Sequence, residues 1–230
     1  MAGRPKDFLD KARGAFRAGN FAEALENYEY FFDHALDGDT ASYYGVRLSY
    51  CLDEWTQLAV KFPAALDRLQ KKRDDSLELL IQTRDPERFH DFETICKYLK
   101  CENLPVEKFL VVHASDPELA KTIFRFIRSD LVRQGLWDVC AVHLTDTAEQ
   151  YKFYLQRLDE IMKINEKEGW NHDVIKERHV RDVSDLLLIL NNTGKYEEVA
   201  YLQKSILSDM QSRNLPELAK DILKDARLSD

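Results

Sequence analysis

The sequence is poor in the residues that make turns, since its 230 residues include only eight glycines and six prolines. A fold of many short strands needs frequent turns, so this composition disfavours a β-sandwich or a β-barrel. The longest aliphatic run, Leu186 to Leu190, is far shorter than the roughly 18 residues of a membrane span. The amino terminus also has no apolar run behind a basic start. We therefore expect a cytoplasmic protein without a membrane segment.

The four cysteines form neither a disulfide framework nor a zinc-ligand pattern, because only Cys96 and Cys101 are close in sequence. The sequence also lacks a glycine-rich phosphate loop, H-E-x-x-H and G-x-S-x-G. Adjacent pairs such as His90-Asp91 point in different directions on a helix and do not form a site alone. We expect no cofactor, no metal and no catalytic residues, and hence a protein that is not an enzyme.

Positive charge is in the minority, with 33 Lys and Arg against 41 Asp and Glu and a net charge of −8. A balance of this sign disfavours a protein whose main role is binding phosphate backbones. The densest basic segment, from Arg68 to Arg73, alternates along the chain with the acidic residues Asp67, Asp74, Asp75 and Glu78 on either side of it. Such interleaving is typical of an exposed helix with ion pairs. We expect no nucleic-acid partner.

Apolar residues recur with the spacing of an α-helix along nearly the whole chain. Asp85-Pro86 and Asp116-Pro117 each predict a helix start, and Thr145 or Thr147 is expected to cap a long helix. Another helix is expected to break before Pro63. The pattern predicts an all-α fold of about eleven to thirteen helices without a strand.

Three places share a local pattern of glycine, any residue, an aromatic residue, two variable residues and a small or β-branched residue. A glycine there lets the chain turn through a left-handed conformation, the aromatic ring is expected to fill the inner corner, and the small residue lets two helices cross closely. The three places are Gly19-Asn20-Phe21…Ala24, Gly135-Leu136-Trp137…Cys140 and Gly194-Lys195-Tyr196…Val199.

This pattern resembles the tetratricopeptide repeat, a helix hairpin of about 34 residues that stacks into a solenoid. The best match is Phe8 to Leu36, in which a small residue and a closing proline of the family are replaced by Phe31 and Leu36. The resemblance implies an α-solenoid of stacked antiparallel hairpins, as a single repeat domain over residues 1–230. A subdivision into 1–84, 85–145 and 146–230 is compatible with the breaks in the helical pattern.

The resemblance also implies a partner-binding groove, because the first helix of each hairpin in that family lines a concave surface that holds peptides or partner helices. Arg13 and Arg17 are four residues apart and therefore on one face of that helix. Aromatic residues and arginine are enriched where interfaces are anchored. The candidate partner-binding residues are Arg13, Phe16, Arg17, Tyr44, Arg47 and Trp55.

We therefore expect a non-catalytic module that binds a peptide or a partner protein on a concave helical surface. Two alternatives stay open. One is a dedicated inhibitor or immunity-type protein for a basic effector, which the net charge of −8 suits. The other is an enzyme or small-ligand binder with a pocket between helices.

Overall fold

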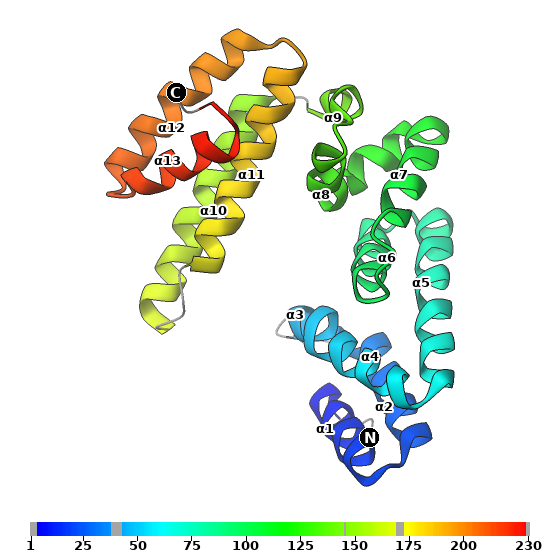
Figure 1. Ribbon diagram of the computed structural model, residues 1–230. Coiled ribbons are helices and arrows are strands. Elements are labelled where there is room, and N and C mark those ends of the chain that lie inside the picture. The colour runs from blue at the N-terminus through cyan, green and yellow to red at the C-terminus, as the bar shows by residue number, and fades with distance from the viewer. Residues whose placement is uncertain (1–3, 38–42, 145, 169–172, 229–230) are drawn as a thin grey trace. The chain divides into compact units, whose positions relative to one another are not determined.

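The computed structural model describes residues 4–37, 43–144, 146–168 and 173–228, and every regular element in these ranges is a helix (Figure 1). The predicted all-α fold is therefore confirmed. The chain divides into two compact units, Met1–Phe126 and Ile127–Asp230, and the division falls within helix α8, Pro117–Arg133. The boundaries that we expected after residues 84 and 145 stay predictions about the repeat pattern.

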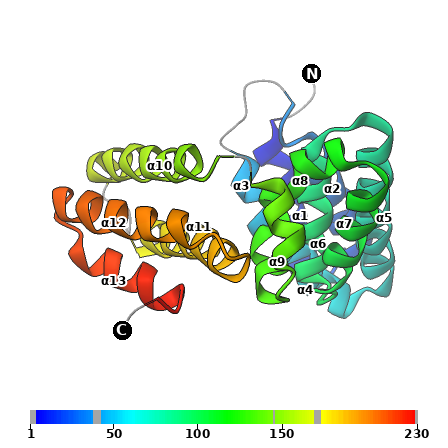
Figure 2. The same ribbon diagram turned by 90° about the horizontal axis from the view of Figure 1, so that it is seen from above.

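Unit 1 contains seven helices and the first part of an eighth within its described residues. Figures 1 and 2 show α1, α4 and α6 along one side of this unit and α2, α5 and α7 along the other. The bounds are α1 Pro5–Ala18, α2 Phe21–His34, α3 Tyr44–Val46, α4 Leu52–Lys61, α5 Pro63–Thr83, α6 Pro86–Tyr98, α7 Leu104–Ser115 and α8 Pro117–Arg133.

The core of unit 1 is rich in aromatic side chains. Tyr28, Phe31 and Phe32 of α2 are buried against α1 and α4, together with Trp55 and Leu58. Burial of a large apolar side chain stabilises a fold by about 1.5–3 kcal/mol, so these side chains contribute strongly to the stability of unit 1.

Unit 2 contains the end of α8 and five further helices. The aliphatic run from Leu186 to Leu190 lies in its core, where four of the five side chains are buried. Further core residues come from α10, α12 and α13. The bounds are α9 Trp137–His143, α10 Thr147–Glu168, α11 Asp173–Asn192, α12 Tyr196–Ser212 and α13 Pro216–Asp225.

The three predicted glycine turns are present. The φ angles of Gly19, Gly135 and Gly194 are 80°, 71° and 76°, in the left-handed region that favours glycine. The small residue that ends each pattern is buried. The aromatic residue behaves as predicted only in part, because Tyr196 is 65% exposed and does not fill an inner corner.

Helix starts follow the predicted capping chemistry with one exception. Asp85 accepts a hydrogen bond from the backbone N–H of Glu87 at 3.1 Å, and Asp116 accepts one from Leu119 at 3.0 Å. At α10, Asp146 accepts from the backbone N–H of Glu149 at 3.0 Å, so this aspartate caps the helix in place of Thr147. The alternative cap, Thr145, lies outside the described residues.

A π-helical turn, Arg47–Cys51, joins α3 to α4. Such wide turns are rare and occur mostly as single turns, frequently beside functional sites. The turn changes the direction in which the side chains of α4 point relative to a regular helix. It lies between Tyr44 and Trp55, two of the candidate partner-binding residues.

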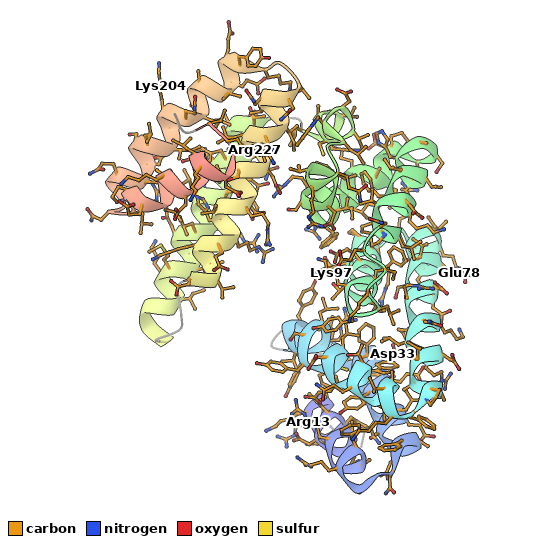
Figure 3. The ribbon with its side chains drawn as sticks, in the orientation of Figure 1. Arg13, Asp33, Glu78, Lys97, Lys204 and Arg227 are labelled. Atoms are coloured by element: carbon orange, nitrogen blue, oxygen red, sulfur yellow. The ribbon has the colours of Figure 1, made fainter. Side chains whose placement is uncertain are left out.

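The basic segment of α5 forms one ion pair of the kind predicted, within the helix, and one to a neighbouring helix that the sequence did not predict. Lys71 pairs with Asp75 at 2.7 Å, and Lys72 reaches Asp33 of α2 at 2.8 Å. Figure 3 labels Asp33 on the neighbouring helix. Across the described residues, no helix combines the length and the apolar character that crossing a membrane requires.

Candidate functional site

Arg13, the first candidate, is held in place by a carboxylate from another helix. Its Nε and Nη2 atoms donate to Glu54 of α4 at 2.9 Å and 2.7 Å (Figure 3 labels Arg13). The hydroxyl of Tyr28 on α2 donates to the same carboxylate at 3.2 Å. A bidentate arginine–carboxylate pair fixes both side chains in one geometry. The hydrogen bond to Glu54 raises the pKa of Arg13, and burial raises the pKa of Tyr28, so both of these side chains stay protonated at neutral pH.

These three residues line one side of a hollow of about 270 Å³, which we call the α1 groove. Its lining is completed by Phe16, Arg17 and Gln57. The groove is therefore lined by residues from three helices, α1, α2 and α4.

Arg17 and Phe16 give the α1 groove its exposed chemistry. Arg17 is exposed and has no acidic partner among the described residues. Phe16 is half-buried against Phe21, with ring centroids 5.9 Å apart. Lys61 of α4 places its Nζ 4.9 Å from the Phe16 ring, and it too lacks an acidic partner within the described residues. The Phe16 ring therefore has Lys61 over it and shares the groove lining with Arg17, and neither cation has a counter-charge among the described residues.

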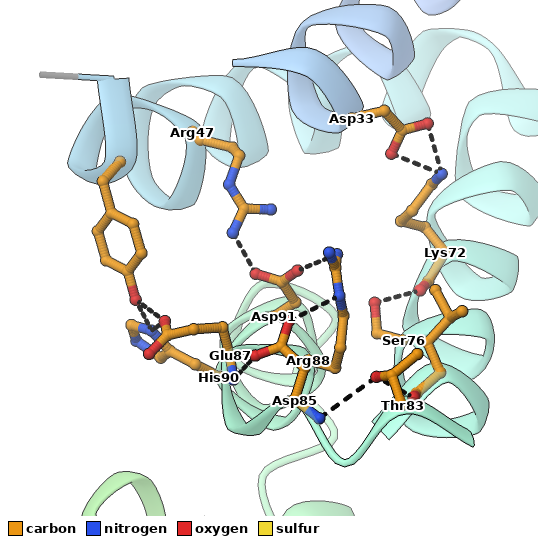
Figure 4. A network of polar contacts seen from close by, with 12 residues as sticks. Asp33, Arg47, Lys72, Ser76, Thr83, Asp85, Glu87, Arg88, His90 and Asp91 are labelled. Atoms are coloured by element: carbon orange, nitrogen blue, oxygen red, sulfur yellow. Dashed lines mark hydrogen bonds and ion pairs between the residues drawn. The ribbon is translucent and has the colours of Figure 1, made fainter. Parts of the chain in front are cut away.

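Tyr44 belongs to a second polar cluster in unit 1. Its hydroxyl donates to Glu87 of α6 and lies 2.6 Å from Nδ1 of His90. Because the single hydroxyl proton points to Glu87, the Nδ1–H of His90 donates to the Tyr44 oxygen. Arg125 of α8 donates to Glu87 at 2.7 Å. Figure 4 shows Glu87 and His90 close together on α6.

Burial controls the protonation of this cluster. It lowers the pKa of His90 to about 4, so the imidazole is neutral at neutral pH. The ring stacks on Phe126 at a centroid distance of 4.6 Å. Burial followed by the hydrogen bond to Glu87 raises the pKa of Tyr44. The cluster holds its hydrogen bonds unchanged through the physiological pH range.

Arg47 and Trp55 are not surface anchors, and the prediction for both is corrected here. Arg47 is only 4% exposed and forms an ion pair with the buried Asp91 (Figure 4). Its guanidinium also lies over the Phe32 ring, 4.5 Å from the centroid. Trp55 is completely buried, and its indole N–H donates to the Ala65 carbonyl at 3.0 Å. The helix that carries them is apolar on more than one side, and the sequence alone does not fix which side faces the core.

The sequence analysis missed Glu54, Gln57 and Lys61. Nothing local connects Glu54 to Arg13, because the two positions are 41 residues apart. Once Glu54 faces α1, its neighbours three and seven positions later lie on the same side of α4. That spacing is the signal that could have added Gln57 and Lys61.

The described residues that line the α1 groove can bind a ligand through charge, hydrogen bonds and apolar contact, and no catalytic arrangement is evident among them. In the part of the chain that is described, no three His, Cys, Asp or Glu side chains gather as a metal site would need. Three of the four cysteines are buried and none forms a disulfide. Burial raises the pKa of Cys140 to about 12, which keeps that thiol protonated and unreactive.

In comparisons with known proteins, no family model, no curated protein and no solved structure matches this chain. The likeness to tetratricopeptide repeats therefore stays a prediction from the glycine–aromatic pattern. What the chain offers as evidence of function is the geometry of its own side chains.

Proposed function

We propose that unit 1 is a non-catalytic protein-recognition module that binds an acidic peptide segment of a partner protein in the α1 groove. The observation that carries this proposal is that Phe16 shares the lining of the groove with Arg17 and has Lys61 over its ring, and that neither cation has an internal counter-charge among the described residues. Uncompensated cations beside an aromatic ring suit a partner that supplies carboxylates and an apolar side chain.

The paired residues behind this ring support the proposal. Arg13 and Glu54 neutralise one another, so they add no net charge but hold the groove in one shape. A surface that is already ordered loses little conformational entropy when a partner binds. The expected stacking of hairpins into a tetratricopeptide-like solenoid would place α1 on a concave face, where that family binds peptides.

The test is a charge reversal that leaves the paired residues intact. We expect Arg17→Glu with Lys61→Glu to remove the partner in quantitative affinity purification from cells that express the chain natively. Lys108→Glu is the matched control, because Lys108 is an exposed lysine on α7 without an acidic partner in the described residues. The partner segment, made as a peptide, should bind the double variant about tenfold more weakly or worse in calorimetry. Equal partner recovery by the double variant and the control would contradict the proposal.

A groove in unit 2 favours a second candidate, an inhibitor of a basic effector. The groove between α11 and α13 has a volume of about 810 Å³. Five carboxylates and two cations line it around an apolar floor that includes Val180 and Leu218. A single basic protein that is lost with Glu217→Lys and Asp221→Lys, but kept with Arg17→Glu, would select this candidate over the first.

A further inference from the structure

Helix α6 ends in a turn that joins two cysteines. The backbone N–H of Cys101 donates to the carbonyl of Cys96 at 2.9 Å, and the N–H of Lys100 donates to the carbonyl of Lys97 at 3.1 Å. Lys100 has a φ angle of 57°, in the left-handed region. These are the features of a Schellman motif, in which the side chains at the two ends of the turn frequently contact one another. In this turn, a cysteine stands at each end.

The side chains of the two cysteines interact. The Cys101 thiol donates to the Cys96 carbonyl at 3.4 Å, so its sulfur points back toward that residue. Burial, followed by a direct interaction with the Cys101 thiol, raises the pKa of Cys96. The backbone hydrogen bond between the two residues also keeps their Cα atoms within the upper limit of about 6.8 Å for a disulfide. A disulfide can therefore form here through rotation of the two side chains.

The two sulfurs differ in their surroundings. Cys96 is completely buried and Cys101 is partly exposed, so a small oxidant in solution meets Cys101 first. Arg73 of α5 donates from Nη1 to the Cys101 sulfur at 3.9 Å, while its Nε pairs with Asp74 at 2.8 Å. A guanidinium beside a sulfur stabilises the thiolate, which is the form that reacts with peroxides.

We propose that Cys96 and Cys101 form a reversible intramolecular disulfide when the protein meets a hydroperoxide. The Cys101 thiolate attacks a peroxide oxygen, the O–O bond breaks, and the leaving oxygen takes up the proton that the thiol gave off. Cys101 is then a sulfenic acid. The Cys96 sulfur attacks the Cys101 sulfur, the S–O bond breaks, and the Cys96 proton leaves with the hydroxyl group as water. Two thiols thus lose two electrons to one peroxide, and a dithiol reductant restores them.

The other two cysteines of the chain serve as internal controls. Cys51 and Cys140 are buried, and no second thiol acts on either one in the described part of the chain. We expect them to stay reduced under conditions that join Cys96 to Cys101. None of the residues that carry this proposal lines the α1 groove, so it and the proposed function fail separately.

The first test is treatment of the full chain with excess hydrogen peroxide, followed by alkylation in denaturant and tryptic digestion without reductant. Trypsin cleaves between the two cysteines, which fall on the separate peptides 89–97 and 101–108. We expect mass spectrometry to find these peptides as one linked species, with Cys51 and Cys140 alkylated. Dithiothreitol before alkylation should return the two peptides unlinked. Two unlinked peptides after peroxide alone, or a disulfide between two copies of the chain, would overturn the proposal.

The second test assigns the order of the two steps. Cys96→Ala should leave Cys101 as a sulfenic acid that dimedone traps, because the sulfur that resolves it is gone. Cys101→Ser should leave Cys96 alkylated after the same treatment, because that thiol is buried. Circular dichroism checks that both variants are folded. Dimedone on Cys96 in the Cys101→Ser variant, or none on Cys101 in the Cys96→Ala variant, would overturn the order of attack.

The third test measures the rate of disulfide formation in two arginine variants. Arg73→Gln should slow the reaction about threefold or more, because it removes the cation beside the Cys101 sulfur. Arg68→Gln is the matched control, since Arg68 is an exposed arginine of the same helix that pairs with Glu29 at 3.3 Å. Its rate should differ from that of the wild type by less than about twofold. Equal rates for the two variants would show that Arg73 does not assist Cys101.

Discussion

Arg47 and Asp91 form a buried ion pair. Removing Asp91 is expected to lower the free energy of unfolding more than removing Arg47. Among the residues that the structure describes, Arg47 has no other carboxylate partner, and its Nε atom has no hydrogen-bond partner. Asp91 also contacts Arg88, whose Nη1 lies 3.4 Å from it. Asp91→Leu therefore leaves a buried cation alone, which typically costs about 3–5 kcal/mol in the free energy of unfolding.

Arg47→Met should cost less, about 2–3 kcal/mol, because Asp91 keeps Arg88 and can be protonated. Burial already raises the pKa of Asp91, which makes that protonation easier. The double variant Arg47→Met with Asp91→Leu removes both charges. Its cost should fall short of the sum of the single costs by about 2 kcal/mol or more.

The assay is urea unfolding followed by far-ultraviolet circular dichroism, with Arg88→Gln as a control. Arg88 is 43% exposed, so its loss should cost less than about 1 kcal/mol. If Asp91→Leu costs no more than Arg88→Gln, or if the single costs add, the pair is not the buried link between the α3–α4 segment and α6. Arg47→Met should leave partner binding in the α1 groove unchanged once the protein is folded.

Three further predictions concern stability. Burial lowers the pKa of His90 to about 4. As the pH falls, the unfolded chain therefore takes up a proton at this histidine before the folded chain does. Between about pH 7 and pH 5 this difference lowers the free energy of unfolding by about 2 kcal/mol. In urea unfolding at both pH values, His90→Gln should lose about 2 kcal/mol less than the wild type over that interval, and an equal loss would refute this assignment. Gly19→Ala should destabilise by about 1 kcal/mol because φ is 80°, whereas Gly14→Ala inside α1, where an added Cβ meets no heavy atom within 4 Å, should stabilise by about 0.5–1 kcal/mol in thermal melts. Trp55→Phe should cost about 2 kcal/mol in the same melts through lost volume and the lost hydrogen bond to Ala65, and a neutral effect would argue against its buried position.

Local chemistry made much of the fold predictable. A capping aspartate followed by proline marks a helix start wherever it occurs, and Asp85 and Asp116 both behave this way. The glycine turns were found because a left-handed φ angle is a local requirement. Asp146 was missed because the threonines on either side of it are also acceptable caps, although aspartate is the stronger N-cap residue.

The candidate site was predictable only where a single helix decides it. Arg13, Phe16 and Arg17 share one groove because they are three and four residues apart on α1. Glu54 could not be assigned to that groove, since its position depends on how α4 packs against α1. Arg47 and Trp55 were placed on the wrong side for the same reason: the direction of their side chains depends on the π-helical turn.

That wide turn fixes the rotational phase of the helix that follows it. In an ordinary α-helix each residue advances the side-chain direction by about 100°, so one residue more or fewer in the turn would redirect every later position. Glu54 and Trp55 are adjacent in sequence, yet Glu54 pairs with Arg13, whereas Trp55 is buried in the core. Deleting one residue of Arg47–Cys51 would move Trp55 to the place of Glu54 and Thr56 to the place of Trp55, while leaving the composition almost unchanged. We therefore expect this part of the chain to tolerate a change in the length of the π-helical turn less well than a substitution on either side of it.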